Sequence, residues 1–214
     1  KRAAADSGTV TLKDYQGRGL ATQVFEYSIP YLRELGIEEY LLEVLQHNTG
    51  ALSVYRKLGF EITREFYYFK QKNEQVDRAV KALDCCYTLK SIKISEYSSI
   101  HKFWDFEPSW QNSFEAINNA LKDFICLGVF LESKLVGYGV FEPVSGDVTQ
   151  IAVDKEHRRK GIGSLLCQKM LESNKHSSSI KIINTDIDCN SITAFLKSKN
   201  IGPVGKQFEM IKKL

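Results

Sequence analysis

The sequence predicts an α/β protein (α+β, with a mixed sheet) that consists of two similar copies in tandem. A glycine-rich segment occurs twice, as Gln16-Gly17-Arg18-Gly19-Leu20-Ala21 and as Arg158-Arg159-Lys160-Gly161-Ile162-Gly163. Each segment lies between a short β-like run and an amphipathic helix pattern, and each helix is followed by a further strand, helix and strand. Hydrophobic residues make up 43% of the 214 residues and charged residues 26%, which excludes disordered, collagen-like and coiled-coil chains.

The first copy reads as five elements in a row. The apolar residues of its first helix pattern share one face, and Pro30 inside that pattern should kink or break the helix. These apolar-face residues are Ala21, Val24, Phe25, Ser28, Leu32 and Leu35. The expected elements are a strand at 9–12, a helix over 21–35, a strand at 39–46, a helix over 49–58 that ends at Gly59, and a closing strand at 61–69.

A connecting helix is expected between the copies. Asn73 is a suitable N-cap, and the apolar residues that follow it recur at helical spacing up to Asp84. We therefore predict a linker over 73–86 that is helical rather than flexible.

The second copy has additional material before its glycine segment. A strand at 87–95, two short helices over 97–106 and 109–122, and a hairpin of strands at 124–131 and 135–141 precede it. The elements that repeat the first copy are a strand at 148–153, a helix with Ile162, Leu165, Leu166 and Met170 on one face, a strand at 179–187, a helix over 191–199 and a closing strand at 207–211.

Size, charge and leader signals limit the classes of function. The chain is long enough for one or two domains, and its net charge of +3 argues against a general nucleic-acid-binding protein. No apolar run reaches the roughly 18 residues of a membrane-spanning helix, and no apolar stretch follows residues 1–6 as in a signal peptide. We therefore expect neither a nucleic acid nor a membrane as partner.

The cysteines suggest a reducing compartment. The chain has five of them, with no Cys-x-x-Cys spacing and no Cys/His cluster. An odd number without pairing signals is typical of free buried thiols, so we expect a cytoplasmic protein without a metal site.

The glycine segments have the properties of a phosphate-binding turn. Glycines between a strand and a helix let a ligand approach the backbone, and the unpaired N–H groups of the first helical turn favour an anion. Arg158, Arg159 and Lys160 add positive charge in the second copy, and Arg18 does so in the first. The spacing matches neither a Walker A loop nor a GxGxxG turn.

The pattern [Gln/Arg]-x-x-Gly-x-[Gly/Ala] resembles the acyl-CoA-binding motif of the GCN5-related N-acetyltransferase (GNAT) family. The first copy adds Asn48-x-x-Ala51-x-x-x-Tyr55-x-x-x-Gly59-Phe60, which resembles the next motif of that family. The resemblance covers nearly the whole chain as two tandem domains. It implies the second half of a first domain at 1–72, a linker at 73–86 and a complete second domain at 87–214.

Two departures from the family pattern stand out. The first copy starts at what the family would call its fourth strand, and we expect that the preceding strands are missing from the sequence rather than lost from the protein. In the second copy the second motif has decayed, so that Leu196 stands in the position of Tyr55 and Cys189 in that of Asn48.

The resemblance also implies a binding site for acetyl-CoA in the opening between the fourth and fifth strands. Tyr55 would donate a proton to the departing thiolate, Asn48 would either contact the cofactor or only cap its helix, and the general base stays open among Glu43, His47, Asp186 and Asp188. The cofactor-binding residues implied for the second copy are Ile151, Ala152, Val153, Arg158, Arg159, Lys160, Gly161, Ile162, Gly163 and Ser164. Those implied for the first copy are Leu12, Gln16, Gly17, Arg18, Gly19, Ala21 and Asn48.

The implied activity is transfer of an acetyl group from acetyl-CoA to a primary amine by direct attack. The acceptor would be a small molecule or a peptide, and the oligomeric state is open. The alternative is a catalytically degenerate module that binds CoA without turnover. Trp104, Trp110, Phe103 and Phe106 lie where the family has its acceptor floor, although a plain hydrophobic core is the favoured interpretation of this cluster.

Overall fold

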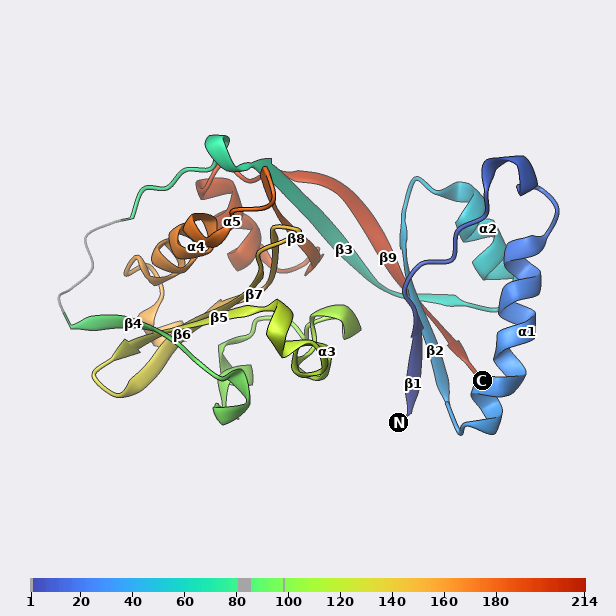
Figure 1. The fold of residues 1–214 in the computed structure, drawn as a ribbon, viewed down its shortest axis with the longest axis horizontal. Coiled ribbons are helices and arrows are strands. Elements are labelled where there is room, and N and C mark those ends of the chain that lie inside the picture. The colour runs from blue at the N-terminus through green and yellow to red at the C-terminus, as the bar shows by residue number, and fades with distance from the viewer. Residues whose placement is uncertain (1, 81–85, 98) are drawn as a thin grey trace. The chain divides into compact units, whose positions relative to one another are not determined.

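The computed structural model describes residues 2–80, 86–97 and 99–214 (Figure 1). The chain forms two compact units, which do not follow the linear division at 72 and 86 that we expected. The first unit contains the residues up to Phe66 together with Gly205–Leu214, and the second unit contains Tyr67–Val204. The end of the chain therefore belongs to the unit that its beginning forms.

The first unit has the elements expected for the first copy, except at its start. No strand forms at 9–12, where Val10 and Leu12 are 86% and 72% exposed; the strand lies earlier, at Ala3–Asp6, and pairs in parallel with β2. Backbone pairing with β2 thus places a strand in an alanine-rich segment of low β propensity. The elements are β1 (Ala3–Asp6), α1 (Leu20–Glu34), β2 (Glu39–Leu45), α2 (Thr49–Lys57) and β3 (Glu61–Lys72).

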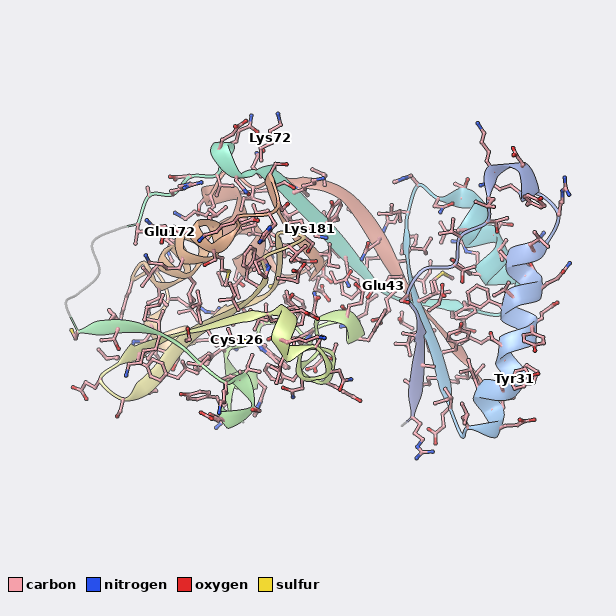
Figure 2. All side chains as sticks on the ribbon, viewed as in Figure 1. Tyr31, Glu43, Lys72, Cys126, Glu172 and Lys181 are labelled. Carbon is pink, nitrogen blue, oxygen red and sulfur yellow. The ribbon has the colours of Figure 1, made fainter. Side chains whose placement is uncertain are left out.

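Helix α1 packs on the strands of the first unit through a narrower face than expected. Phe25 and Ile29 are buried, whereas Val24 and Leu35 from the predicted apolar face are 55% and 66% exposed. Tyr31, labelled on α1 in Figure 2, is also exposed. The helix runs through Pro30 without interruption, so of the predicted kink or break the break does not occur.

The last strand of the chain closes the first unit, which corrects the prediction that it closes the second copy. β9 (Pro203–Lys213) pairs antiparallel with β2, from Glu39 opposite Lys213 to Leu45 opposite Gln207. Buried Glu209 on β9 binds Arg64 of β3 through an ion pair of 2.7 Å. The strand order is β1-β2-β9-β3 in the first unit and β3-β8-β7-β6-β5-β4 in the second.

The predicted connecting helix does not form over its described part. Asn73–Gln75 make a single 3-10 turn, and residues 76–80 have no regular structure; the rest of the predicted helix, 81–84, lies outside the described residues. The N–H group of Asp77 donates to the carbonyl of Lys199, and the Lys199 ammonium donates to the carbonyl of Ala79. These backbone groups bind Lys199 in place of helical partners.

The second unit is a sheet with a core on each face. On one face, Val129 and Val136 pack with Leu166 and Met170 of α4; on the other, residues such as Tyr138 pack with Ile117 of α3. Figure 1 shows α4 and α3 on opposite sides of these strands. The elements are β4 (Tyr87–Ser91), α3 (Phe114–Asn119), β5 (Ile125–Leu131), β6 (Lys134–Glu142), β7 (Asp147–Val153), α4 (Ile162–Ser173), β8 (Ser179–Asp186) and α5 (Asn190–Ser198).

The two helices predicted between β4 and β5 are mostly absent. The six-residue helix α3 is the longest helical element there. The other helical elements of this segment are 3-10 turns at Ile94–Glu96, Ile100–Phe103, Trp110–Asn112 and Leu121–Asp123. Within the described ranges, no helix has both the length and the apolar character required to cross a bilayer.

Asp147 at the start of β7 should make the stability of the second unit depend on pH. Its carboxylate lies 3.6 Å from the ammonium of Lys181 on β8, which Figure 2 labels, and burial raises the pKa of Asp147 to about 6. The reference pKa of an unfolded aspartate is about 3.9, so the folded state binds this proton more tightly. The stabilisation is complete below about pH 4 and is lost as the pH rises through about 6.

We expect Asp147→Asn to remove this contribution, which is about 3 kcal/mol in full. Urea unfolding at pH 4.5 and pH 7.5 gives the difference in unfolding free energy between the two pH values. This difference should be smaller in the variant than in the parent. Asp154→Asn is the control, because the contribution of Asp154 to stability changes with pH in the opposite direction. Burial opposes ionisation of Asp154, but bonds from the Glu156 N–H and from Lys134 hold its pKa below the usual range. Parallel pH profiles for parent and Asp147→Asn would contradict the prediction.

Candidate functional site

A cavity of about 640 Å³ lies within the second unit. Its walls come from the length of β7, the glycine turn that follows β7, the middle of β8, helix α5 and the loop 103–112. We call this loop the acceptor-side loop, because the family resemblance implies an acceptor floor there. Residues 77–80 of the connecting segment also contribute, through Asp77, Ala79 and Val80.

Strands β7 and β8 separate to open the cavity. They are parallel and pair at one position, Asp147 opposite Lys181. On its other edge β7 stays paired with β6 as far as Val153. The edge of β7 that faces β8 therefore presents backbone N–H and C=O groups to the cavity between Val148 and Val153.

The glycine turn of the second copy has the backbone of an anion site. Gly161 has the left-handed φ of 89° and caps α4, while Arg159 has a φ of 64°. The first helical bond runs from the Leu165 N–H to the Gly161 carbonyl, so the preceding N–H groups have no partner within the helix. These groups and the helix dipole favour a negatively charged ligand at the turn.

The second glycine of the turn serves packing. A Cβ on Gly163 would lie 3.2 Å from the ring of Phe195 on α5. The glycine thus allows α4 and α5 to approach each other closely beside the cavity.

The two copies of the turn correspond in structure. Gly17 and Gly19 have φ values of 76° and 75°, and Gly19 caps α1 as Gly161 caps α4. The leading side chain of each motif bonds to the carbonyl five residues earlier. Gln16 Nε2 donates to Thr11 O at 3.2 Å, and Arg158 Nε donates to Val153 O at 3.1 Å.

The second motif also repeats, although its side chains differ. The N–H of Phe60 donates to the carbonyl of Tyr55, and the N–H of Ile201 donates to that of Leu196. Leu196 therefore occupies the backbone position of Tyr55. Asn48 caps α2 by accepting a hydrogen bond from the Ala51 N–H, as the capping alternative predicted.

Tyr55 lies in the aromatic core of the first unit. It is 9% exposed, its ring packs edge-on against Phe25 and Phe60, and burial raises the pKa of its hydroxyl.

The cavity gathers nine of the ten cofactor-binding residues predicted for the second copy. The exception is Lys160, which is exposed and outside the lining. The residues predicted for the first copy belong to the first unit and form no part of this cavity. Of the suggested general bases, Asp186 and Asp188 are likewise absent from the lining, and Glu43 and His47 lie in the first unit.

A buried polar network lies in the wall of the cavity that includes the loop 103–112. The Tyr138 hydroxyl accepts a hydrogen bond from Trp104 Nε1 at 2.5 Å and donates to Gln150 Oε1 at 2.6 Å. Gln150 Nε2 donates to the carbonyl of Asn112, whose Nδ2 donates to the Ile183 carbonyl at 3.1 Å. Asn112 thereby connects β7 to β8 across the opening, and burial raises the pKa of Tyr138.

Tyr138, Gln150 and Asn112 could not be predicted from the sequence, because they belong to no motif and lie far apart in the chain. Three aromatic residues of the same wall were among those predicted. Phe103, Trp104 and Phe106 line the cavity, whereas Trp110 does not. Three of the four residues of the predicted aromatic cluster thus line the cavity, so the cluster is not only a hydrophobic core.

One carboxylate in the cavity wall is held in an ion pair. Asp105 accepts hydrogen bonds from Arg158 at 2.8 and 3.1 Å and from Ser191 Oγ at 2.5 Å. Burial alone would raise the pKa of Asp105, but these bonds hold it below the usual range. Asp105 is therefore a poor proton acceptor near neutral pH.

Two curated relatives match part of the chain in sequence. N-alpha-acetyltransferase MAK3 of Arabidopsis thaliana is 38% identical over 60 residues, which are 28% of this chain and 32% of the relative. N-alpha-acetyltransferase 30 of Schizosaccharomyces pombe is 33% identical over 58 residues, 27% of this chain and 39% of the relative. The matches thus span about a third of the length of these curated relatives.

A solved structure described as a tandem GNAT protein from the clavulanic acid biosynthesis pathway shares the fold. The superposition covers 99% of this chain and 75% of the solved chain, with a TM-score of 0.76 at 14% sequence identity. The sequence profile of the Acetyltransferase (GNAT) family matches residues 2–60 and 86–194, which is more than half of the chain. The chain therefore belongs to the acetyltransferase (GNAT) family, with two family regions in tandem.

Proposed function

We propose that the protein is an acetyl-CoA-dependent N-acetyltransferase and that its second unit binds the cofactor. The observation that carries the proposal is that one cavity combines the left-handed glycine turn at the start of α4 with the opening between β7 and β8. Acetyl-CoA supplies a thioester whose carbonyl a primary amine attacks directly, with the CoA thiol as the leaving group.

The residues of the turn and of β7 suit the parts of this cofactor. The N–H groups of Ile162, Gly163 and Ser164 would hold the diphosphate, with the positive charge of Arg159 beside them. The backbone edge of β7 at 151–153 would pair with the amides of the pantetheine arm and stabilise the developing oxyanion. A diphosphate and an amide-bearing arm of this kind are both present in CoA.

We infer that the acceptor is the α-amino group of a peptide. An α-amine has a pKa of about 7.7–8.0 and a lysine side chain about 10.4, so far more of the α-amine is neutral near pH 7. Such an acceptor needs less help from a general base. This suits a cavity whose carboxylate Asp105 is already paired with Arg158 and is a poor proton acceptor. Two relatives are named N-alpha-acetyltransferases. A small-molecule amine is the other acceptor class.

A CoA-binding module without turnover is the second candidate. It is favoured by Leu196, which is 2% exposed and offers no proton donor where the first copy has Tyr55. Thiol release from acetyl-CoA separates the two candidates, measured over peptides with free N-termini, N-terminally blocked lysine peptides and small amines. Turnover highest with free N-termini supports the proposal, and CoA binding without thiol release from any amine supports the module.

The role of Tyr55 as proton donor stays a prediction about the first unit. Tyr55→Phe removes the hydroxyl and keeps the ring in its aromatic cluster. If the chemistry occurs in the second unit, as we propose, turnover should stay within about twofold of the parent. A loss of tenfold or more would assign the chemistry to the first unit.

The proposal includes a reducing, cytoplasmic location. In the described part of the chain, Cys86, Cys126, Cys167 and Cys189 are free thiols. Burial raises the pKa of Cys167 to about 11, so this thiol stays protonated and unreactive near neutral pH.

A further inference from the structure

We propose that Arg158 is a positioning residue that fixes the acceptor-side loop through Asp105, and that it does not bind the cofactor's phosphates. The inference rests on the proposed function, because it assigns a role within the cofactor site. It changes the role expected from the sequence, where Arg158 counted as one of three cations at the phosphate turn.

The contacts of the guanidinium carry the proposal. Nη1 donates to Asp105 Oδ2 at 2.8 Å, and Nη2 donates to Asp105 Oδ1 at 3.1 Å. Nη2 also donates to the Phe103 carbonyl at 3.0 Å, and Nε to the Val153 carbonyl at 3.1 Å. These are four hydrogen bonds from a group with five N–H donors, so a phosphate that binds the guanidinium with two parallel hydrogen bonds would have to displace the paired carboxylate.

Asp105 joins three walls of the cavity. Besides Arg158, it accepts a hydrogen bond from Ser191 in the first turn of α5. Arg158 follows β7, Ser191 follows β8, and Asp105 belongs to the acceptor-side loop. Asp105 therefore links the loop to the segments that follow both strands, through the ion pair with Arg158 and the hydrogen bond from Ser191.

The first copy provides a natural comparison. Gln16 occupies the position of Arg158 and makes the equivalent bond to the strand, to the Thr11 carbonyl. A glutamine is thus sufficient to close the turn. The longer, forked arginine adds the bonds to Asp105 and Phe103. Arg158→Gln should accordingly keep the turn and release the loop.

The acceptor-side loop carries its own spectroscopic reporters. Trp104 and Trp110 are the two tryptophans of the chain, and both lie within 103–112. Trp104 directly precedes Asp105, the residue that Arg158 binds. Its Nε1 donates a hydrogen bond to the Tyr138 hydroxyl. Release of the loop should make these indoles more accessible to a quencher such as acrylamide.

The experiment compares Arg158→Gln with Arg159→Gln in the full chain, with CoA as the probe. Calorimetry gives the Kd for CoA, and acrylamide quenching of tryptophan fluorescence gives the exposure of the loop. We expect Arg158→Gln to increase quenching at least twofold and to change the Kd by less than about threefold. Arg159 is the adjacent cation in the cavity lining. Arg159→Gln should weaken the binding of CoA about tenfold and leave quenching unchanged.

Variants of Asp105 test the same link from the other side. Asp105→Asn should reproduce the increased quenching, and Asp105→Glu, which keeps the carboxylate, should restore the parent's value. An Arg158→Gln variant that loses CoA affinity tenfold or more with the quenching of the parent would overturn the proposal, as would Asp105→Asn with unchanged quenching. If the parent itself does not bind CoA, the proposed function fails, whereas the quenching comparison without CoA still decides the role of Arg158.

Discussion

Replacing Gly161 with Glu is expected to abolish binding of CoA, with an affinity at least a hundredfold below that of the parent. Gly161 has a φ of 89° directly before α4, a conformation that residues with a Cβ rarely adopt. The introduced carboxylate would lie beside the N–H groups that suit a diphosphate, so it would compete for them and repel the ligand. Calorimetry with CoA measures the effect.

Gly161→Ala is the matched control, since it adds the backbone strain without the charge. It should weaken CoA less than the glutamate does. Circular dichroism and the tryptophan fluorescence of the second unit establish that both variants are folded. A folded Gly161→Glu variant that binds CoA as the parent does would show that the phosphate site lies elsewhere.

Replacing Gly146 with Ala should destabilise the second unit by at least about 3 kcal/mol. Gly146 lies in the turn between β6 and β7 with a φ of 78°, and a Cβ there would stand 2.1 Å from the backbone carbonyl of Ser179. The N–H of Lys181 also donates to the carbonyl of Gly146, so the turn cannot move away without losing a backbone bond. Strain and overlap thus act together.

Two alanine substitutions separate these causes. Gly17 has a φ of 76° and open space around its Cβ position, so Gly17→Ala reports the strain alone, about 1–2 kcal/mol. Gly202 in the second unit has open space and no left-handed φ, so Gly202→Ala should change stability by less than about 0.5 kcal/mol. Urea unfolding followed by tryptophan fluorescence measures Gly146→Ala and Gly202→Ala in the second unit, and unfolding followed by circular dichroism measures Gly17→Ala in the first. A Gly146→Ala variant as stable as Gly202→Ala would refute the prediction.

The local elements were the most predictable part of this protein. The helices α1, α2, α4 and α5 and the strands β2, β5 and β6 follow from apolar periodicity and from glycine stop signals. Periodicity failed where tertiary bonds replaced local ones. The segment after Asn73 has a helical pattern, but its backbone binds Lys199. The loop 103–112 folds around Tyr138 and Asn112 instead of forming helices.

The candidate site divides in the same way. The glycine turn, where we propose that the cofactor binds, follows from a contiguous motif, because the glycines and the helix start act within a few residues of one another. The opposite wall, formed by the loop 103–112, depends on residues that the fold brings together, such as Asp105 and Arg158, which are 53 positions apart.

The sequence by itself determined the repeated turn, the helices that the two glycines cap and the family to which the chain belongs. These properties depend on backbone conformation and apolar spacing within short segments. Only the tertiary structure decided that β9 closes the first unit, that a strand forms at Ala3–Asp6 and that Arg158 is bound by a carboxylate. Strand pairing and ion pairing join distant segments, and their energies depend on which edges and charges the fold places in contact.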